Sequence, residues 1–239
     1  MTTTRPTVGM VYPGHAAEDE YPAAARTLGV HLPVAHVYGT DLHAVAELLD
    51  LGSPDRLAGG AEQLAAHGPQ AVMWACTSGS FVYGPEGARD QVAELARRTG
   101  VPTSSTSLAF VAGLEALGSA RVAVAATYPR VVADLFGEFL AAAGVEVVSL
   151  TGAGIDTAAE VGTLGPDEVA ELAVRHDHPR AEVLLVPDTA MRTLDVLPRL
   201  EARLGKPVLT ANQVTIWYGL RLAGARPHAP TLGTLFARK

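Results

Sequence analysis

The sequence predicts an α/β fold made of two similar lobes, each a parallel sheet flanked by helices, with an active site in the cleft between them. Short apolar runs alternate with segments of helical spacing, as in parallel sheets covered by helices. The pattern begins again about half-way along the 239 residues. Both halves also close with Gly-Leu, three further residues and Gly, at 113–118 and 219–224.

In the first half, short apolar runs that end in turn residues predict strands. We expect these strands at 7–14, 32–37, 72–75 and 101–103. Helical spacing predicts helices over 55–67, from Pro85 to a stop at Gly100, and over 108–117. The acidic stretch 15–21 is interpreted as a loop and a helix start.

The second half opens on an apolar run that ends, like the first strand, in Tyr-Pro. Strands are predicted at 121–126, 145–150, 183–187 and 207–210, and helices over 131–142, 167–174, 194–204 and 214–222. From Tyr12 to Cys76 the chain runs 64 positions, and from Tyr128 to Asp188 it runs 60. We interpret the two halves as an internal duplication, which would place Cys76 and Asp188 on opposite walls of a cleft.

Composition narrows the class of protein. The net charge of −7 argues against nucleic acid and anionic membrane as partners, although it leaves an anionic small molecule open. One cysteine permits no intrachain disulfide, which fits a reducing cytoplasm, and no apolar run is long enough to span a bilayer. The short polar N-terminus shows no signal peptide. A homo-oligomer is left open.

No metal site is expected. His176, Asp177 and His178 form the one histidine cluster, and they lack the spacing of a zinc site. Their charged and proline-containing surroundings are typical of a solvated turn.

The stretch around Cys76 is the strongest candidate for chemistry. An apolar run at 72–75 ends in Cys76 and is followed by Thr-Ser-Gly-Ser, as at the carboxyl end of a buried strand where small-molecule sites form. A helix start and local donors are expected to lower the thiol pKa, so that Cys76 serves as a thiolate base or a thiol acid. Facing Asp188, it suggests proton transfer at a carbon next to a carboxylate, through an enediolate that fixed donors stabilise.

The catalytic candidates are therefore Cys76 and Asp188. The predicted substrate-binding residues are Tyr12, Pro13, Thr77, Ser78, Tyr128, Thr189 and Asn212. Structural alternatives exist for most of them: a buried apolar role for the cysteine, a helix cap for Asp188 and packing for the tyrosines. Helix capping is the favoured interpretation of Thr106, Ser107, Asn212 and Gln213.

Three stretches carry a family resemblance. ACTSGSFVYG at 75–84, Ala-Thr-Tyr-Pro at 126–129, and 184–213 continuing to 224 resemble the aspartate/glutamate racemase superfamily, near its arylmalonate decarboxylase, maleate isomerase and ectoine-utilisation branch. The resemblance implies a cofactor-free, metal-free enzyme of two pseudo-symmetric lobes. It assigns 1–117 with 211–239 to the first lobe and 118–210 to the second.

The resemblance also implies roles for individual residues. Racemases and maleate isomerases of this family carry a cysteine on each wall, and Cys76 matches the first. In arylmalonate decarboxylases the first position is glycine, the second cysteine protonates the enediolate, and the residues matching Thr77, Ser78 and Tyr128 hold the carboxylate. In this chain the second wall carries Asp188 instead.

That departure changes the expected substrate. A carboxylate at 188 would repel a dicarboxylate unless it is protonated or paired, for which Arg192 is the candidate, and it disfavours maleate. The expected function is carbanion chemistry at the α-carbon of a small carboxylate, as a decarboxylase, racemase or cis-trans isomerase. The alternatives are an isomerase of amino-acid derivatives of the ectoine type, and a two-lobed binding protein that has lost its second catalytic group.

Overall fold

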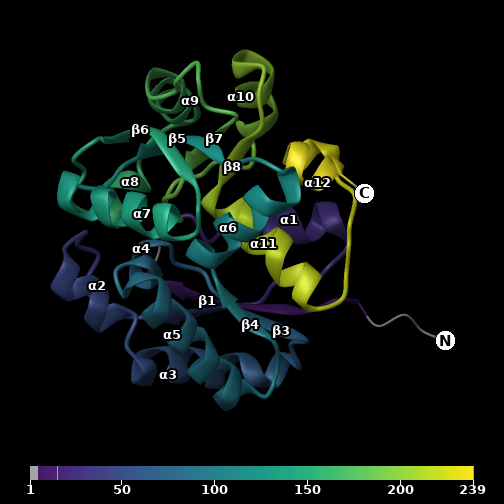
Figure 1. Cartoon of the computed structure of the whole chain (residues 1–239). Coiled ribbons are helices and arrows are strands. Elements are labelled where there is room, and N and C mark those ends of the chain that lie inside the picture. The colour runs from purple at the N-terminus through teal and green to yellow at the C-terminus, as the bar shows by residue number, and fades with distance from the viewer. Residues whose placement is uncertain (1–4, 15, 239) are drawn as a thin grey trace.

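The computed structural model describes residues 5–14 and 16–238, and over these the chain forms two four-stranded parallel sheets (Figure 1). The strand order is β2-β1-β3-β4 in the first sheet and β6-β5-β7-β8 in the second. The second order repeats the first with every strand number raised by four, and all pairings within the sheets are parallel. The predicted α/β class and the internal duplication are confirmed.

The strands are β1 (Val8–Pro13), β2 (Val34–Val37), β3 (Ala71–Trp74), β4 (Thr103–Ser105), β5 (Arg121–Ala126), β6 (Glu146–Gly152), β7 (Val183–Val186) and β8 (Val208–Thr210). The helices of the first half are α1 (Glu20–Leu28), α2 (Val45–Leu51), α3 (Pro54–Leu64), η1 (Ala65–His67), α4 (Ser78–Phe81), α5 (Gly84–Thr99) and α6 (Thr106–Leu117). Those that follow are α7 (Arg130–Ala142), α8 (Ala158–Val161), α9 (Pro166–Arg175), α10 (Leu197–Leu204), α11 (Ala211–Leu222), η2 (Pro230–Leu232) and α12 (Thr234–Ala237).

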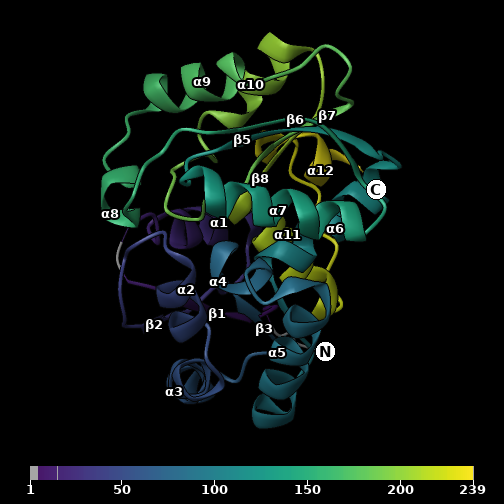
Figure 2. The ribbon, with the colours of Figure 1, turned by 60° about the vertical axis from the view of Figure 1, so that its left-hand side comes forward.

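Helices separate and cover the two sheets. Helices α6, α7 and α11 lie between the sheets, whereas α3 and α5 lie on the far side of the first sheet and α9 and α10 on the far side of the second (Figures 1 and 2). Helix α11 contacts β3 in the first sheet and β8 in the second, and it packs along α6. The proposed lobe boundaries at 117/118 and 210/211 therefore remain a prediction, because α11 is shared by both sheets.

Most predicted elements lie where the sequence placed them. The short helices α4, α8 and α12 were not predicted, and α10 begins at Leu197, three residues later than expected. Three other differences concern β4, α1 and α2. Strand β4 begins two residues later than expected, because Pro102 has no N–H to give to the sheet and instead accepts from Val72 N–H at 3.0 Å. Helix α1 extends well beyond the helix start expected in 15–21, of which residue 15 lies outside the described residues. Helix α2 was not predicted, and no side chain caps its N-terminus.

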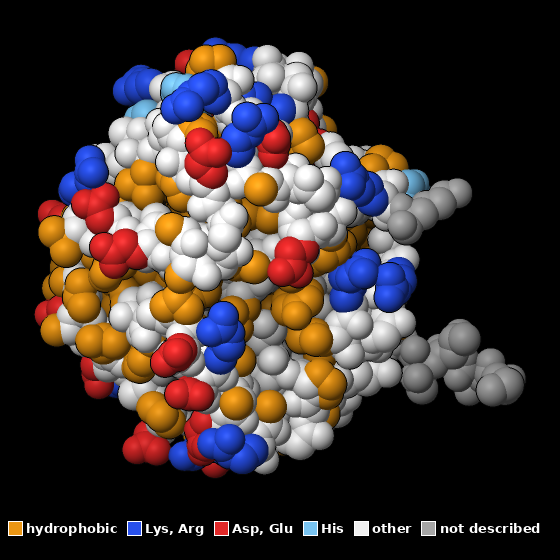
Figure 3. Space-filling view, in the orientation of Figure 1, with side chains coloured by type: hydrophobic (Ala, Val, Ile, Leu, Met, Phe, Trp, Pro, Cys, Tyr) orange, Lys and Arg blue, Asp and Glu red, His pale blue; other side chains and the backbone are white. Residues whose placement is uncertain are grey.

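The surface carries both charge signs. On the face in Figure 3, basic and acidic side chains are interspersed among hydrophobic atoms. Within the described residues, no helix is long and apolar enough to cross a membrane, and no three His, Cys, Asp or Glu side chains gather as metal ligands would.

A buried carboxylate joins α1 to the segment after β7. Oε1 of Glu20 accepts from the backbone N–H groups of Thr193 and Leu194 at 2.6 and 2.7 Å, and Oε2 accepts from Asn212 Nδ2 at 2.8 Å. Burial raises the pKa of Glu20 to about 7, against these hydrogen bonds, which lower it. Between about pH 4.5 and 7, Glu20 is therefore protonated in the folded state and ionised in the unfolded chain.

We expect this carboxyl to make the fold less stable as the pH rises. A folded-state pKa above the unfolded value gives stability that is complete below about pH 4.5 and is lost as the pH passes 7. The shift corresponds to roughly 3 kcal/mol. Denaturant unfolding at pH 5 and pH 8 gives the free energy of unfolding of the wild type and of Glu20→Gln. The effect of the carboxyl is the change, between the two pH values, in the difference between these two free energies. Glu138→Gln, an exposed site on α7, is the matched control, and equal pH dependence in all three proteins would contradict the prediction.

Candidate active site

Cys76 and Asp188 occupy equivalent places in the two halves. Each lies two residues beyond a central strand, Cys76 after β3 and Asp188 after β7. Both side chains line one small pocket of ≈ 50 Å³. The wider lining contains Tyr12, Pro13, Ala16, Thr40, Asp41, Leu42, His43, Leu48, Leu51, Ser78, Ala158, Thr189 and Ala190.

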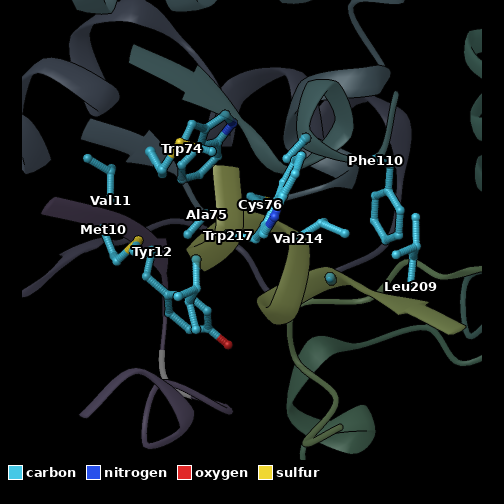
Figure 4. Packing of buried hydrophobic residues seen from close by; sticks show 14 of the residues in the cluster. Met10, Val11, Tyr12, Trp74, Ala75, Cys76, Phe110, Leu209, Val214 and Trp217 are labelled. Carbon is cyan, nitrogen blue, oxygen red and sulfur yellow. The ribbon is translucent and has the colours of Figure 1, made fainter. Parts of the chain in front are cut away.

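The thiol of Cys76 is held by the loop that follows it. The side chain is 3% exposed, its Sγ accepts from Gly79 N–H at 3.3 Å, and the Ser78 hydroxyl lies 3.8 Å away. Gly79 is required here for close approach, since a Cβ would lie 2.9 Å from Trp74 and 3.1 Å from Sγ. Figure 4 shows Cys76 among the buried hydrophobic side chains of the core.

The expectation of a lowered thiol pKa is wrong. Burial raises the pKa of Cys76 to about 11, with a smaller contribution from the negative charge of Asp188, and together these outweigh the Gly79 N–H and the Ser78 hydroxyl, which lower it. Helix α4, which begins at Ser78, has only four residues. The resting side chain at neutral pH is therefore a neutral thiol, which can donate a proton.

We expect iodoacetamide to label this cysteine slowly at pH 7. Only the thiolate reacts, and at a pKa of about 11 the labelling rate should rise about tenfold per pH unit up to pH 10. Because the chain has one cysteine, intact mass spectrometry reports its modification directly. Labelling at pH 7 as fast as that of free cysteine would contradict a buried, protonated thiol.

Asp188 is 3% exposed and accepts hydrogen bonds within the second half of the chain. Its Oδ1 accepts from Ala190 N–H at 2.9 Å, and its Oδ2 accepts from the Thr127 hydroxyl. The segment after it is not helical, and α10 begins only at Leu197. Asp188 therefore closes a tight turn and caps no helix, and its carboxylate remains on the pocket wall.

His43 faces Asp188 across the pocket wall. Its Nε2 lies 3.8 Å from Asp188 Oδ2, and its ring packs edge-on against Tyr128 at 5.0 Å between centroids. The backbone N–H of His43 donates to the backbone oxygen of Asp156, and an isolated β-bridge pairs Leu42 with Thr157. The segment 40–43 thus crosses from the first sheet to the second over the pocket.

Three predicted binding residues lie outside the pocket lining. Tyr128 donates to Pro187 O at 2.8 Å, and burial raises its pKa well above 10. Asn212 belongs to the Glu20 cluster, where its Oδ1 accepts from Tyr21. Among the described residues, the buried Thr77 Oγ1 has no hydrogen-bond partner. The other four predicted binding residues, Tyr12, Pro13, Ser78 and Thr189, do line the pocket.

Tyr12 connects the two walls. Its hydroxyl donates to Thr189 O at 2.9 Å and accepts from Ala17 N–H at 3.1 Å. Figure 4 shows its phenol oxygen pointing away from Met10 and Trp74 of the core. This hydroxyl therefore fixes the position of Thr189 relative to the first sheet.

The suggested pairing of Arg192 with Asp188 is wrong. Arg192 forms a salt bridge with Asp19, with Nε 3.0 and 3.1 Å from the two carboxylate oxygens, and donates to Gly162 O and Ala16 O. The cationic candidate beside Asp188 is His43 instead, which the sequence interpretation missed. No spacing signal marks it, because a loop from the first half delivers it to a strand end 145 residues away.

Part of the pocket lining is apolar. Leu42, Leu48, Leu51 and Ala158 belong to the lining, as do Ser78 and Thr189. Helix α2 contributes two of these leucines, so this unpredicted helix shapes the site. The pocket lining thus combines a thiol, two carboxyl groups, an imidazole, several hydroxyls and apolar side chains.

Comparisons with known proteins identify the family of this chain. The family model for arylmalonate decarboxylase matches residues 21–236. The arylmalonate decarboxylase of Bordetella bronchiseptica is 32% identical over 97% of this chain and 96% of its own length. The chain belongs to the arylmalonate decarboxylase family. Membership makes it an enzyme of a family of cofactor-independent lyases and isomerases, and the predicted superfamily branch is confirmed.

Two further proteins are similar to this member of the arylmalonate decarboxylase family. The maleate isomerase of Geobacillus stearothermophilus is 27% identical over 70% of this chain and 69% of its own length. A crystal structure of a liganded arylmalonate decarboxylase double mutant, in which a glycine became cysteine and a cysteine became serine, superposes with a TM-score of 0.86. That structure is 27% identical and the match covers 98% of this chain and 100% of the mutant.

Proposed function

We propose that this chain decarboxylates small malonates that carry an apolar α-substituent, with Cys76 as the proton donor. The bond from the α-carbon to one carboxylate breaks, CO₂ leaves, and the electron pair passes into the remaining carboxylate as an enediolate. The Cys76 thiol then gives its proton to the α-carbon, and the thiolate regains a proton from solvent. No redox partner is needed.

The observation that carries the proposal is one buried, neutral thiol on a pocket wall that faces a carboxylate. Decarboxylation needs an acid after CO₂ has left, and a thiol with a pKa near 11 is protonated at neutral pH. Racemisation and thiol addition both need a thiolate at the start, which the same environment disfavours. The apolar side chains of the pocket suit an apolar α-substituent, and the hydroxyls of Ser78 and Thr189 suit the retained carboxylate.

A panel of substituted malonates tests the proposal. Each malonate is incubated with the protein in D₂O, and CO₂ release is measured with the product. We expect one CO₂ and one α-deuterium per product molecule, with phenylmalonate and alkylmalonates converted faster than malonate itself. Absence of CO₂ from the whole panel would reject decarboxylation.

Maleate isomerisation is the second candidate, favoured by the similarity to the Geobacillus stearothermophilus maleate isomerase. It would use Cys76 as a nucleophile that adds to the double bond. Conversion of maleate to fumarate without CO₂ release would identify it. The ectoine-type alternative would instead exchange the α-hydrogen of an amino-acid derivative for deuterium, and a binding protein would gain thermal stability with a carboxylate while forming no product.

We propose the catalytic roles of Cys76 and Asp188 and the binding roles of the seven predicted residues as part of this function. A cytoplasmic location and a homo-oligomer are proposed with them. Thr77 and Tyr128 would support the carboxylate site from behind Ser78, since both lie next to the pocket in the fold. Asn212 would act at a distance, through its hydrogen bond to Thr189 O at 3.1 Å.

A further inference from the structure

We propose that His43 carries a proton against Asp188, which makes the second wall electrically neutral and lets the pocket accept a doubly charged substrate. This inference rests on the proposed function, because the malonates of that proposal are dianions. It assigns His43 as a specificity-determining residue that no sequence motif marks.

The tautomer of the His43 imidazole is set by the contact of Nδ1. His43 Nδ1 lies 3.0 Å from Ile155 O, and a carbonyl oxygen only accepts, so Nδ1 carries a hydrogen. A neutral imidazole has one N–H, and Nε2 would then point a lone pair at Asp188 Oδ2, 3.8 Å away. Two acceptors facing each other in a buried site are unfavourable, and a second ring proton removes the conflict.

The proton shared by the two side chains is assigned to His43 and not to Asp188. Both oxygens of Asp188 act as acceptors, Oδ2 from the Thr127 hydroxyl and Oδ1 from Ala190 N–H. Because both carboxylate oxygens already accept hydrogen bonds, we assign the proton of the pair to the imidazole. The pair is therefore an imidazolium beside a carboxylate, with a net charge of zero.

The other described residues of the pocket lining do not supply a cation that could offset the charge of Asp188. Among the described lining residues there is no Lys or Arg, and Asp41 adds a further acidic side chain. The groups near His43 are Asp188, Tyr128 and, across the pocket, Cys76 and Tyr12. Burial raises the pKa of Cys76 to about 11, and it raises those of Tyr12 and Tyr128 well above the usual value of a tyrosine. Between pH 6 and 9 these three stay neutral, so His43 offsets the charge of Asp188.

The test separates charge from structure with two substitutions. His43→Gln leaves Asp188 uncompensated, and we expect KM for a malonate dianion to rise about 10- to 100-fold with kcat changed little. Adding Asp188→Asn to that variant should restore KM, because the wall is neutral again. Failure of the double variant to recover would overturn the proposal.

A second measurement needs no substrate. In ¹⁵N NMR of the histidine-labelled protein at pH 7, both ring nitrogens of His43 should be protonated in the wild type. In Asp188→Asn at the same pH, the Nε2 proton should be lost in a larger fraction of molecules. A wild-type ring that is neutral at pH 7 would overturn the inference.

The two readouts distinguish this inference from the proposed function. A doubly protonated ring without CO₂ release from any malonate would reject decarboxylation and leave the ion pair intact. Malonate turnover with a neutral ring, or without rescue by the second substitution, would reject the role of His43 and leave the decarboxylase intact.

Discussion

Cys76→Ala should reduce malonate decarboxylation by about 10³-fold, because the carbanion loses its positioned acid. The substitution removes one sulfur atom from a buried site, so the fold and the carboxylate-binding hydroxyls should remain. We therefore expect kcat to fall while KM changes little. Steady-state kinetics with phenylmalonate and a thermal unfolding curve measure both effects.

Two substitutions serve as controls for this loss. Cys76→Ser keeps the size and polarity of the side chain but offers a far weaker acid, so it should be nearly as inactive as Cys76→Ala. Asp188→Asn should lower kcat by less than tenfold, because Asp188 transfers no proton in the proposed reaction. Equal tolerance of changes at 76 and 188 would remove the thiol from the chemistry.

A prochiral substrate such as methyl(phenyl)malonate should yield the enantiomer opposite to that expected of arylmalonate decarboxylases that protonate from the second wall. The resemblance to that family places its protonating cysteine on the second wall. Here the thiol lies on the first wall, and Asp188 occupies the second. Protonation from the other face of the enediolate inverts the product.

Chiral chromatography of the 2-phenylpropionate checks this result. A single enantiomer of the opposite hand fits proton delivery by Cys76 alone. The usual enantiomer would show that the proton comes from the second wall, and a racemic product would show that solvent protonates a released enediolate.

The sequence predicted the fold well because the information was local and repeated. Apolar runs closed by turn residues marked the eight strands, and the Tyr12-Pro13 and Tyr128-Pro129 pairs revealed the duplication that equates Cys76 with Asp188. Equivalent strand ends of equivalent sheets then bring the two side chains to one pocket. Periodicity alone sufficed for this part.

The parts of the site that the sequence did not predict depend on contacts between distant segments, which leave no periodic pattern in the sequence. His43 reaches Asp188 because a loop pairs with residues 155–157 of the other half, and Arg192 is taken from the site by Asp19. The thiol pKa was misjudged because burial outweighs two local donors, and burial depends on side chains from several elements. Asn212 looked like a site residue but is held by Glu20.

The most direct test of the central claim is a crystal structure with benzylphosphonate, a stable dianion shaped like an aryl enediolate. The account predicts the benzylic carbon about 3.5 Å from Cys76 Sγ, with the phosphonate near Ser78 and Thr189 and the ring against the leucines of α2. A ligand bound in this pocket with its benzylic carbon turned toward Asp188 and away from the thiol would contradict it.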